Sequence, residues 1–128
     1  MSLKWLIVIF CLICSNSLAQ TNLTKSATNE LRKIDSTLSK VHYEHKTYSY
    51  KNKPTVKQIE TKSQPPDVTL GRGYGNCSDI AVLTKKLAED KGMKAEYIQE
   101  KNHVAVRVET KNGAAFRYSN GKNTGRTW

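Results

Sequence analysis

The sequence predicts a small α+β domain in which helices precede an antiparallel sheet. Apolar residues recur at helical spacing in two segments, residues 22–43 and the segment from Cys77 to Gly92. After Gly92 the period changes to two, which is typical of half-buried strands. The chain has 128 residues, a length that suits one domain with one hydrophobic core.

The first 19 residues are typical of a secretory signal peptide. Lys4 precedes an apolar run over residues 5–14, and small residues precede a predicted cleavage site between Ala19 and Gln20. This run is shorter than the roughly 20 apolar residues that a membrane span needs. We therefore expect an exported protein, periplasmic or secreted, in which residues 20–128 form a single domain without a membrane span.

Cysteine content and charge narrow the class of protein. Cys77 is the only cysteine after the predicted cleavage site, which excludes an internal disulfide framework. An exported thiol that is alone in its chain is buried, paired between chains, or used chemically. The formal net charge of +10 indicates attraction to anionic surfaces but does not identify a partner.

The helical part of the chain divides into three segments. Residues 22–43 form a predicted amphipathic helix with one apolar stripe: Leu23, Ala27, Leu31, Ile34, Leu38 and Val41. Residues 44–70 are a polar connector with a short helical turn around residues 56–59, and Pro65-Pro66 excludes a continuous helix there. Residues 71–76 form a predicted glycine-dense loop that leads into a helix from Cys77, which ends at Gly92.

The remaining residues predict a three-stranded meander. The expected strands are Met93–Gln99, His103–Glu109 and Ala114–Tyr118, with a hairpin turn at Asn112-Gly113 and a polar tail over residues 119–128.

Cys77 combines two features of a nucleophile. It stands where a glycine-rich loop enters a helix, and backbone N–H groups at a helix N-terminus favour the thiolate. The same N–H groups can stabilise an oxyanion during acyl transfer. His103, at the start of the strongest strand, is the candidate base. Asn120, or Ser119 beside it, is the candidate residue that orients the imidazole.

These residues resemble the transglutaminase-like superfamily, in particular the bacterial transglutaminase-like cysteine peptidases. The resemblance covers residues 71–120 and rests on Gly75-Asn76-Cys77-Ser78-Asp79, the helix that ends at Gly92, and the valine strand that His103 opens. It implies a papain-like core with a helix packed on a small antiparallel sheet, preceded here by an extra N-terminal helix. It further implies an acyl-enzyme thioester on Cys77, with His103 as base, and no metal or organic cofactor.

Two positions depart from the family pattern. Ala105 occupies a position that is usually aromatic, and Ser119 or Asn120 occupies the position of the usual aspartate. The predicted function is a cysteine peptidase or amidase that acts on peptide or protein substrates. The alternatives are a catalytically degenerate binding module and a basic exported protein that binds an anionic polymer.

Other motifs favour structural roles. Asp79 suits the first turn of a helix. His42 and His45 have helical spacing but no further ligand nearby in the sequence, so we expect no metal site. Lysines and tyrosines alternate over residues 46–53, and we expect a solvated connector there rather than a specific nucleic-acid site. A glycan at Asn76, which fits the acceptor pattern, would block Cys77, and this favours a bacterial or phage origin.

Overall fold

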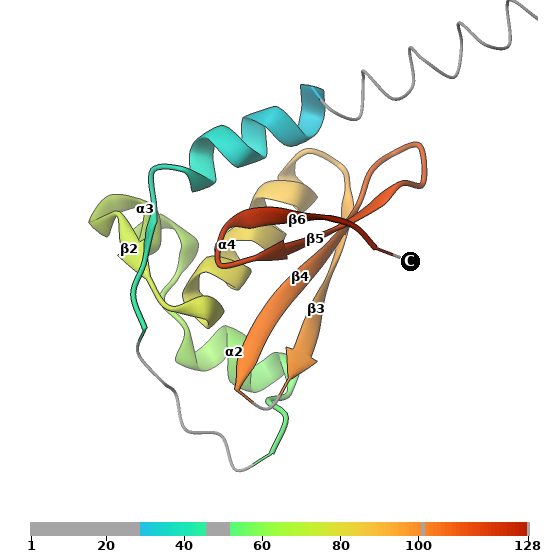
Figure 1. Ribbon diagram of the computed structural model, residues 1–128. Helices are drawn as coiled ribbons and strands as arrows, with labels where there is room; N and C mark the ends of the chain where they lie inside the picture. The colour runs from blue at the N-terminus through green and yellow to red at the C-terminus, as the bar shows by residue number, and fades with distance from the viewer. Residues whose placement is uncertain (1–28, 46–51, 101, 128) are drawn as a thin grey trace, which may run out of the picture.

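The computed structural model describes residues 29–45, 52–100 and 102–127. A helix over residues 29–38, here called the N-terminal helix, comes first. The elements that follow are β1 (His42–Tyr43), α2 (Val56–Lys62), α3 (Pro66–Arg72), β2 (Tyr74–Gly75), α4 (Cys77–Asp90), β3 (Lys94–Glu100), β4 (His103–Glu109), β5 (Ala115–Ser119) and β6 (Lys122–Arg126). Figure 1 shows α4 lying against the sheet of the last four strands, with the N-terminal helix across one end.

The main sheet is antiparallel, with strand order β3-β4-β5-β6. Val106 pairs with Tyr97 on one side and with Tyr118 on the other, so these three side chains share a face. That face packs on α4 and on the N-terminal helix. The buried core comprises Leu31, Ile34, Leu38, Val41, Ile59, Ile80, Ala81, Leu83, Ala88, Met93, Val104, Val106, Val108 and Tyr118. None of the helices in the described ranges is both long and apolar enough to cross a membrane.

The N-terminal helix buries the described part of the predicted apolar stripe but ends earlier than predicted. Leu31, Ile34 and Leu38 are buried, as expected. The helix ends at residue 38 instead of 43, because residues 42–43 form β1. The N–H of His42 donates to the carbonyl of Gly73 at 2.8 Å, and this parallel strand pair replaces the last helical turn. The predicted start of the helix, residues 22–28, lies outside the described residues, as does the predicted signal peptide.

The predicted connector contains two short helices. Thr55 begins α2 with a capping box, in which its hydroxyl accepts from the N–H of Gln58 and its own N–H donates to the Gln58 side chain. Pro66 opens α3, where a proline needs no N–H. The chain does break at Pro65-Pro66, as predicted, but a new helix starts there.

The predicted loop over residues 71–76 is also wrong in part. Its first two residues close α3, Gly73 adopts a left-handed conformation with φ of +76°, and the next two residues form β2.

The C-terminal half follows the prediction more closely. Helix α4 begins at Cys77, Gly92 has the positive φ of a helix-ending glycine, and β4 has the predicted bounds. The tail contains an unpredicted strand, β6. It forms because Asn120 and Gly121 both have positive φ, the geometry of a tight hairpin turn.

The backbone at Gly75 packs closely against the first turn of α4, and a substitution at this position tests that contact. A methyl group at this position would lie 2.8 Å from the Cβ of Asp79 and 3.3 Å from its Oδ2. We expect Gly75→Ala to lower the free energy of unfolding by about 1–3 kcal/mol, because backbone or the first turn of α4 must shift. Chemical denaturation measures this. The matched control is Gly71→Ala, where a methyl group meets nothing within 4 Å. Equal stability of the two variants would contradict the account.

Candidate active site

Cys77 is the first residue of α4, and a capping box fixes the helix start. The side chain of Asn76 accepts from the N–H of Asp79 at 2.9 Å, and Asp79 accepts from the N–H of Asn76 at 3.0 Å. This confirms the structural role predicted for Asp79. The Cys77 side chain is partly exposed and forms no disulfide. The capping box uses the N–H groups of Asn76 and Asp79, and the N–H of Cys77, as the first residue of the helix, has no partner within the helix.

Asp79 also ties α4 to the preceding chain. Its carboxylate accepts from the backbone N–H of Gln64 at 2.8 Å and from the Gln64 side chain at 3.0 Å. Arg72 in turn donates to Gln64 Oε1 at 2.8 Å. The residues before Cys77 are therefore held by a polar network that joins α4, α3 and the loop between α2 and α3.

Tyr43 lies next to Cys77 through strand pairing. It pairs with Gly75 in the two-stranded sheet, two residues before the cysteine. Its hydroxyl shares a hydrogen bond of 3.0 Å with Nδ1 of His45. Burial raises the pKa of Tyr43, and the negative charge of Cys77 raises it further. Tyr43 and His45 thus belong to the surroundings of the thiol.

His103 forms its hydrogen bond with Ser119. The distance from Nε2 to the Ser119 Oγ is 2.7 Å, so Ser119, and not Asn120, is the residue that orients the imidazole in this structure. Burial lowers the pKa of His103, Arg117 lowers it further, and Glu100 opposes both. The lowered pKa keeps the imidazole neutral at pH 7, the state that a general base requires.

Strand geometry places His103 on one face of the sheet. Val106 faces α4, since its partner Tyr97 lies under the ammonium group of Lys85 at 5.3 Å. His103 is three positions from Val106, so its side chain leaves the strand on the other face, with Ser119. No hydrogen bond joins His103 to Cys77 in the structure.

Asn120 lies on the α4 side of the sheet. A methyl group on its neighbour Gly121 would lie 3.3 Å from Ile80 and 3.7 Å from the Cβ of Leu38. The turn between β5 and β6 is therefore held between the first turn of α4 and the N-terminal helix. Asn120 and Tyr43 both line a groove of about 560 Å³ beside this turn.

One comparison with known families gives a match. A family described as a transglutaminase-like domain matches residues 12–115, which is most of the chain. The chain belongs to the transglutaminase-like domain family. Its α+β fold is consistent with that membership, and this family is generally associated with cysteine hydrolase or acyltransferase activity. Searches of curated proteins and of solved structures give no match.

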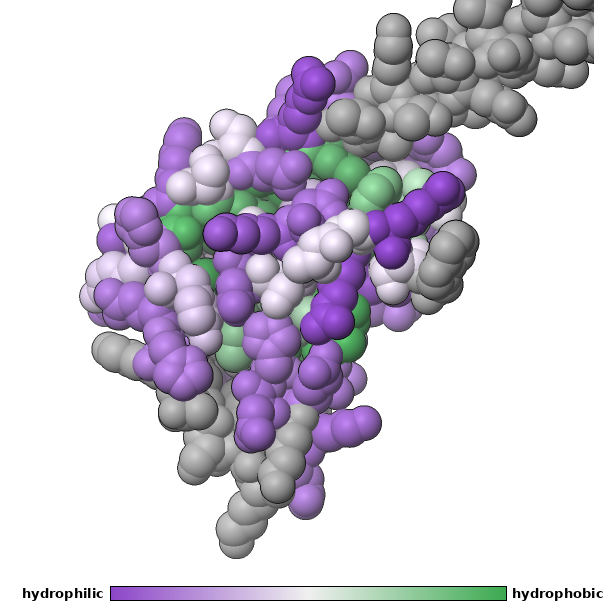
Figure 2. All heavy atoms as spheres, viewed as in Figure 1, coloured by the Kyte–Doolittle hydropathy of each residue, from purple (hydrophilic) through white to green (hydrophobic). Residues whose placement is uncertain are grey.

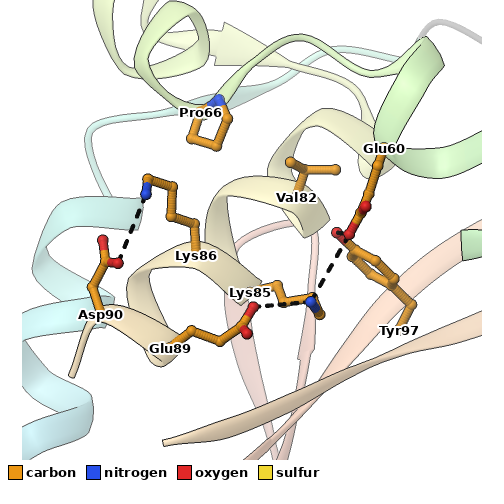
Figure 3. A pocket seen from close by; sticks show the side chains of 8 residues that line it. All are labelled: Glu60, Pro66, Val82, Lys85, Lys86, Glu89, Asp90 and Tyr97. Carbon is orange, nitrogen blue, oxygen red and sulfur yellow. Dashed lines mark hydrogen bonds and ion pairs between the residues drawn. The ribbon is translucent and has the colours of Figure 1, made fainter. Parts of the chain in front are cut away.

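A second hollow of this transglutaminase-like domain is a packing feature. Figure 3 shows Lys85 pointing toward Glu60 and Glu89, with the ring of Tyr97 beside it. Lys85 Nζ lies 2.9 Å from Glu89 and 3.9 Å from Glu60, and Tyr97 donates to Glu60 at 3.2 Å. These charged side chains are paired with each other across the hollow. The contacts therefore join α2, α4 and β3.

Two exposed tyrosines lie in the two-stranded sheet that precedes Cys77. Tyr43 in β1 and Tyr74 in β2 each expose more than a third of their surface. Most of the face in Figure 2 is hydrophilic, with only small hydrophobic areas. Among the described residues, no group of three or more histidine, cysteine or carboxylate side chains could hold a metal ion.

Sequence reasoning missed Tyr43 and His45. It treated His42 and His45 as a helical pair, but His42 lies in β1. No local pattern reveals that this segment pairs with β2, because the pairing joins residues about 30 apart in the chain. The hairpin at Asn120-Gly121, in contrast, has a readable signal, since this dipeptide is the strongest short hairpin motif.

The surroundings of His103 predict how it titrates. We expect its pKa to lie below the ordinary 6.5, with Glu100→Gln lowering it further and Arg117→Gln raising it. NMR of the imidazole Cε1–H against pH measures all three. The pKa of His103 is lower in the folded chain than in the unfolded chain. As the pH falls through 6.5, the unfolded chain therefore takes up this proton more readily, and the free energy of unfolding decreases. A pKa of 6.5 or above in the unsubstituted protein would contradict the account.

Proposed function

We propose that this chain is an exported cysteine hydrolase or acyltransferase that forms a thioester on Cys77 with peptide or protein substrates. The observation that carries the proposal is the position of Cys77, partly exposed as the first residue of α4 in a transglutaminase-like domain. A thiolate there is stabilised by helix N–H groups, and the same groups face the oxygen of an attacked carbonyl.

The reaction follows from these groups. The Cys77 sulfur attacks an amide carbonyl, a C–S bond forms, and the negative charge collects on oxygen near the Cys77 N–H. The C–N bond then breaks, and the proton taken from the thiol passes from His103 to the leaving amine. Water or a primary amine attacks the thioester, giving an acid or a new amide and restoring the thiol. The proposed steps require no cofactor.

The structure supports part of the role proposed for His103. When Nε2 donates to Ser119, Nδ1 is the ring nitrogen that accepts a proton, and burial lowers the pKa of His103, which favours the neutral ring. Catalytic hydrogen bonds are often formed only in the substrate complex. The proposal therefore requires that His103 and Cys77 approach each other when substrate binds.

One observation favours a second candidate, a binding module without turnover. His103 leaves its strand on the face opposite to α4 and is hydrogen-bonded to Ser119. A domain that kept this arrangement with substrate present would retain the peptide site and lose the base. Both candidate functions require that the domain binds a peptide, but only the enzyme converts it to product.

Turnover is testable without a known substrate. The mature chain is incubated with a proteome-derived peptide library and a labelled primary amine. Mass spectrometry then looks for new peptide ends, deamidated glutamine or incorporated amine. We expect at least one product, lost in Cys77→Ala and reduced at least 100-fold in His103→Ala, the lower range for a missing general base. Product that persists in Cys77→Ala would contradict the proposal, and absence of all products would favour the binding module.

Export is part of the same proposal, since the predicted signal segment precedes the described domain. N-terminal sequencing of the chain from its native host is expected to begin at Gln20. A chain that retains residues 1–19 in a soluble cell fraction would contradict it.

A further inference from the structure

The groove beside the β5–β6 turn has a wall of hydrogen-bonding side chains. It is lined by Asp35, Leu38, Ser39, Val41, His42, Tyr43, Asn120, Gly121, Lys122 and Asn123. Leu38 and Val41 line the groove from the N-terminal part of the chain but are only 2% and 9% exposed, and the ring of Tyr43, which is 41% exposed, adds apolar surface on this side. The turn supplies the polar wall opposite, with Asn120 and Lys122 as potential donors.

Asn120 presents one end of its amide to this groove. Its Oδ1 is fully shielded from solvent and has no hydrogen-bond partner. Its Nδ2 is not shielded in this way, and no hydrogen bond involves it in the part of the chain that the structure describes. The end of the amide that a ligand can reach is therefore the N–H donor. The backbone favours asparagine at this position, because its φ of +53° lies in the left-handed region.

Two residues that line the groove connect it with the region of the thiol. Tyr43 lines the groove and interacts electrostatically with Cys77. Gly121, next to Asn120, packs against Ile80, which is three residues after Cys77 in the same helical turn. The other charged group in the groove, Asp35, already accepts a hydrogen bond from Tyr118 at 2.6 Å. A ligand in this groove thus meets free donors from the turn and the exposed ring of Tyr43 on the opposite side.

We infer that Asn120 is a substrate-binding residue, whose amide N–H groups hold a carbonyl oxygen of the acyl substrate in the groove between the N-terminal helix and the β5–β6 turn. This inference rests on the proposed function, since it names the ligand class of the same site. It assigns Asn120 a role different from orienting His103, the role that Ser119 has in this structure. The ligand class is a peptide segment that offers a carbonyl oxygen and an apolar side chain.

Two reagents that modify Cys77 separate thiol reactivity from carbonyl recognition. Methyl methanethiosulfonate contains no carbonyl and reports the thiol alone. Acetyl-dialanyl chloromethyl ketone presents peptide carbonyls and small apolar side chains. The measured quantity is the ratio of the two second-order rate constants, obtained by intact mass for the mature chain and each variant.

The variants keep the turn conformation. Asn120→Asp preserves size and tolerates positive φ but replaces the donor with an acceptor. Asn120→Gly removes the side chain and relieves the backbone. The control is Asn112→Asp, the same change in the hairpin between β4 and β5 at the other end of the sheet.

We expect the chloromethyl ketone rate to fall about tenfold relative to the methanethiosulfonate rate in both Asn120 variants, the loss expected for one hydrogen bond. The control is expected to match the unsubstituted chain. An unchanged ratio in Asn120→Asp would overturn the inference, as would a thiol that reacts with neither reagent. If the ratio falls in the Asn120 variants but the unsubstituted chain turns over no peptide, the inference about Asn120 stands and the proposed enzymatic function fails. If the chain turns over peptides but the ratio is unchanged, the enzymatic function stands and the inference about Asn120 fails.

Discussion

The start of α4 is the constraint on which the site depends. Asn76 and Asp79 satisfy each other's backbone N–H groups, and Gly75 allows Asp79 to approach the chain closely. The same carboxylate holds Gln64, so the segment before the helix is fixed as well. Each of these contacts positions the backbone of Cys77 without using its side chain. The thiol is therefore placed at a helix N-terminus and left available for chemistry.

Packing contacts connect the start of α4 with the rest of the molecule. Ile80, in the first turn of α4, packs against the β5–β6 turn, which also contacts Leu38 of the N-terminal helix. On the other side, β1 pairs with β2 directly before the cysteine. Three parts of the chain that are distant in sequence thus meet around the first turn of α4, and the groove lies where they meet.

Local patterns in the sequence predicted the helix from Cys77 to Gly92 and the strand His103–Glu109, because capping residues and period-two alternation are local signals. The early end of the N-terminal helix and the pairing of β1 with β2 were not predictable in this way, since both depend on contacts between distant segments. Strand β6 was missed although Asn120-Gly121 signals it.

The candidate site was predicted unevenly for the same reason. The helix start that holds Cys77 is a local feature and was foreseen. The choice between Ser119 and Asn120 depends on which face of the sheet each side chain occupies at a turn. The structure joins Ser119 to His103 and directs Asn120 to the groove. Sequence spacing alone could not decide which of these two adjacent residues faces His103, because a shift of one position at the end of a strand moves a side chain to the other face of the sheet.

The central claim is that His103 activates Cys77. Because His103 is proposed to reach Cys77 only when substrate binds, the most direct test uses a peptide-like reagent: the rate of Cys77 alkylation by acetyl-dialanyl chloromethyl ketone at pH 6–8, in the unsubstituted mature chain, His103→Ala and Ser119→Ala. The account predicts that both variants react several-fold more slowly near neutral pH, with His103→Ala the slower. Equal rates in all three proteins would contradict it and would leave a transglutaminase-like domain whose cysteine works without this histidine.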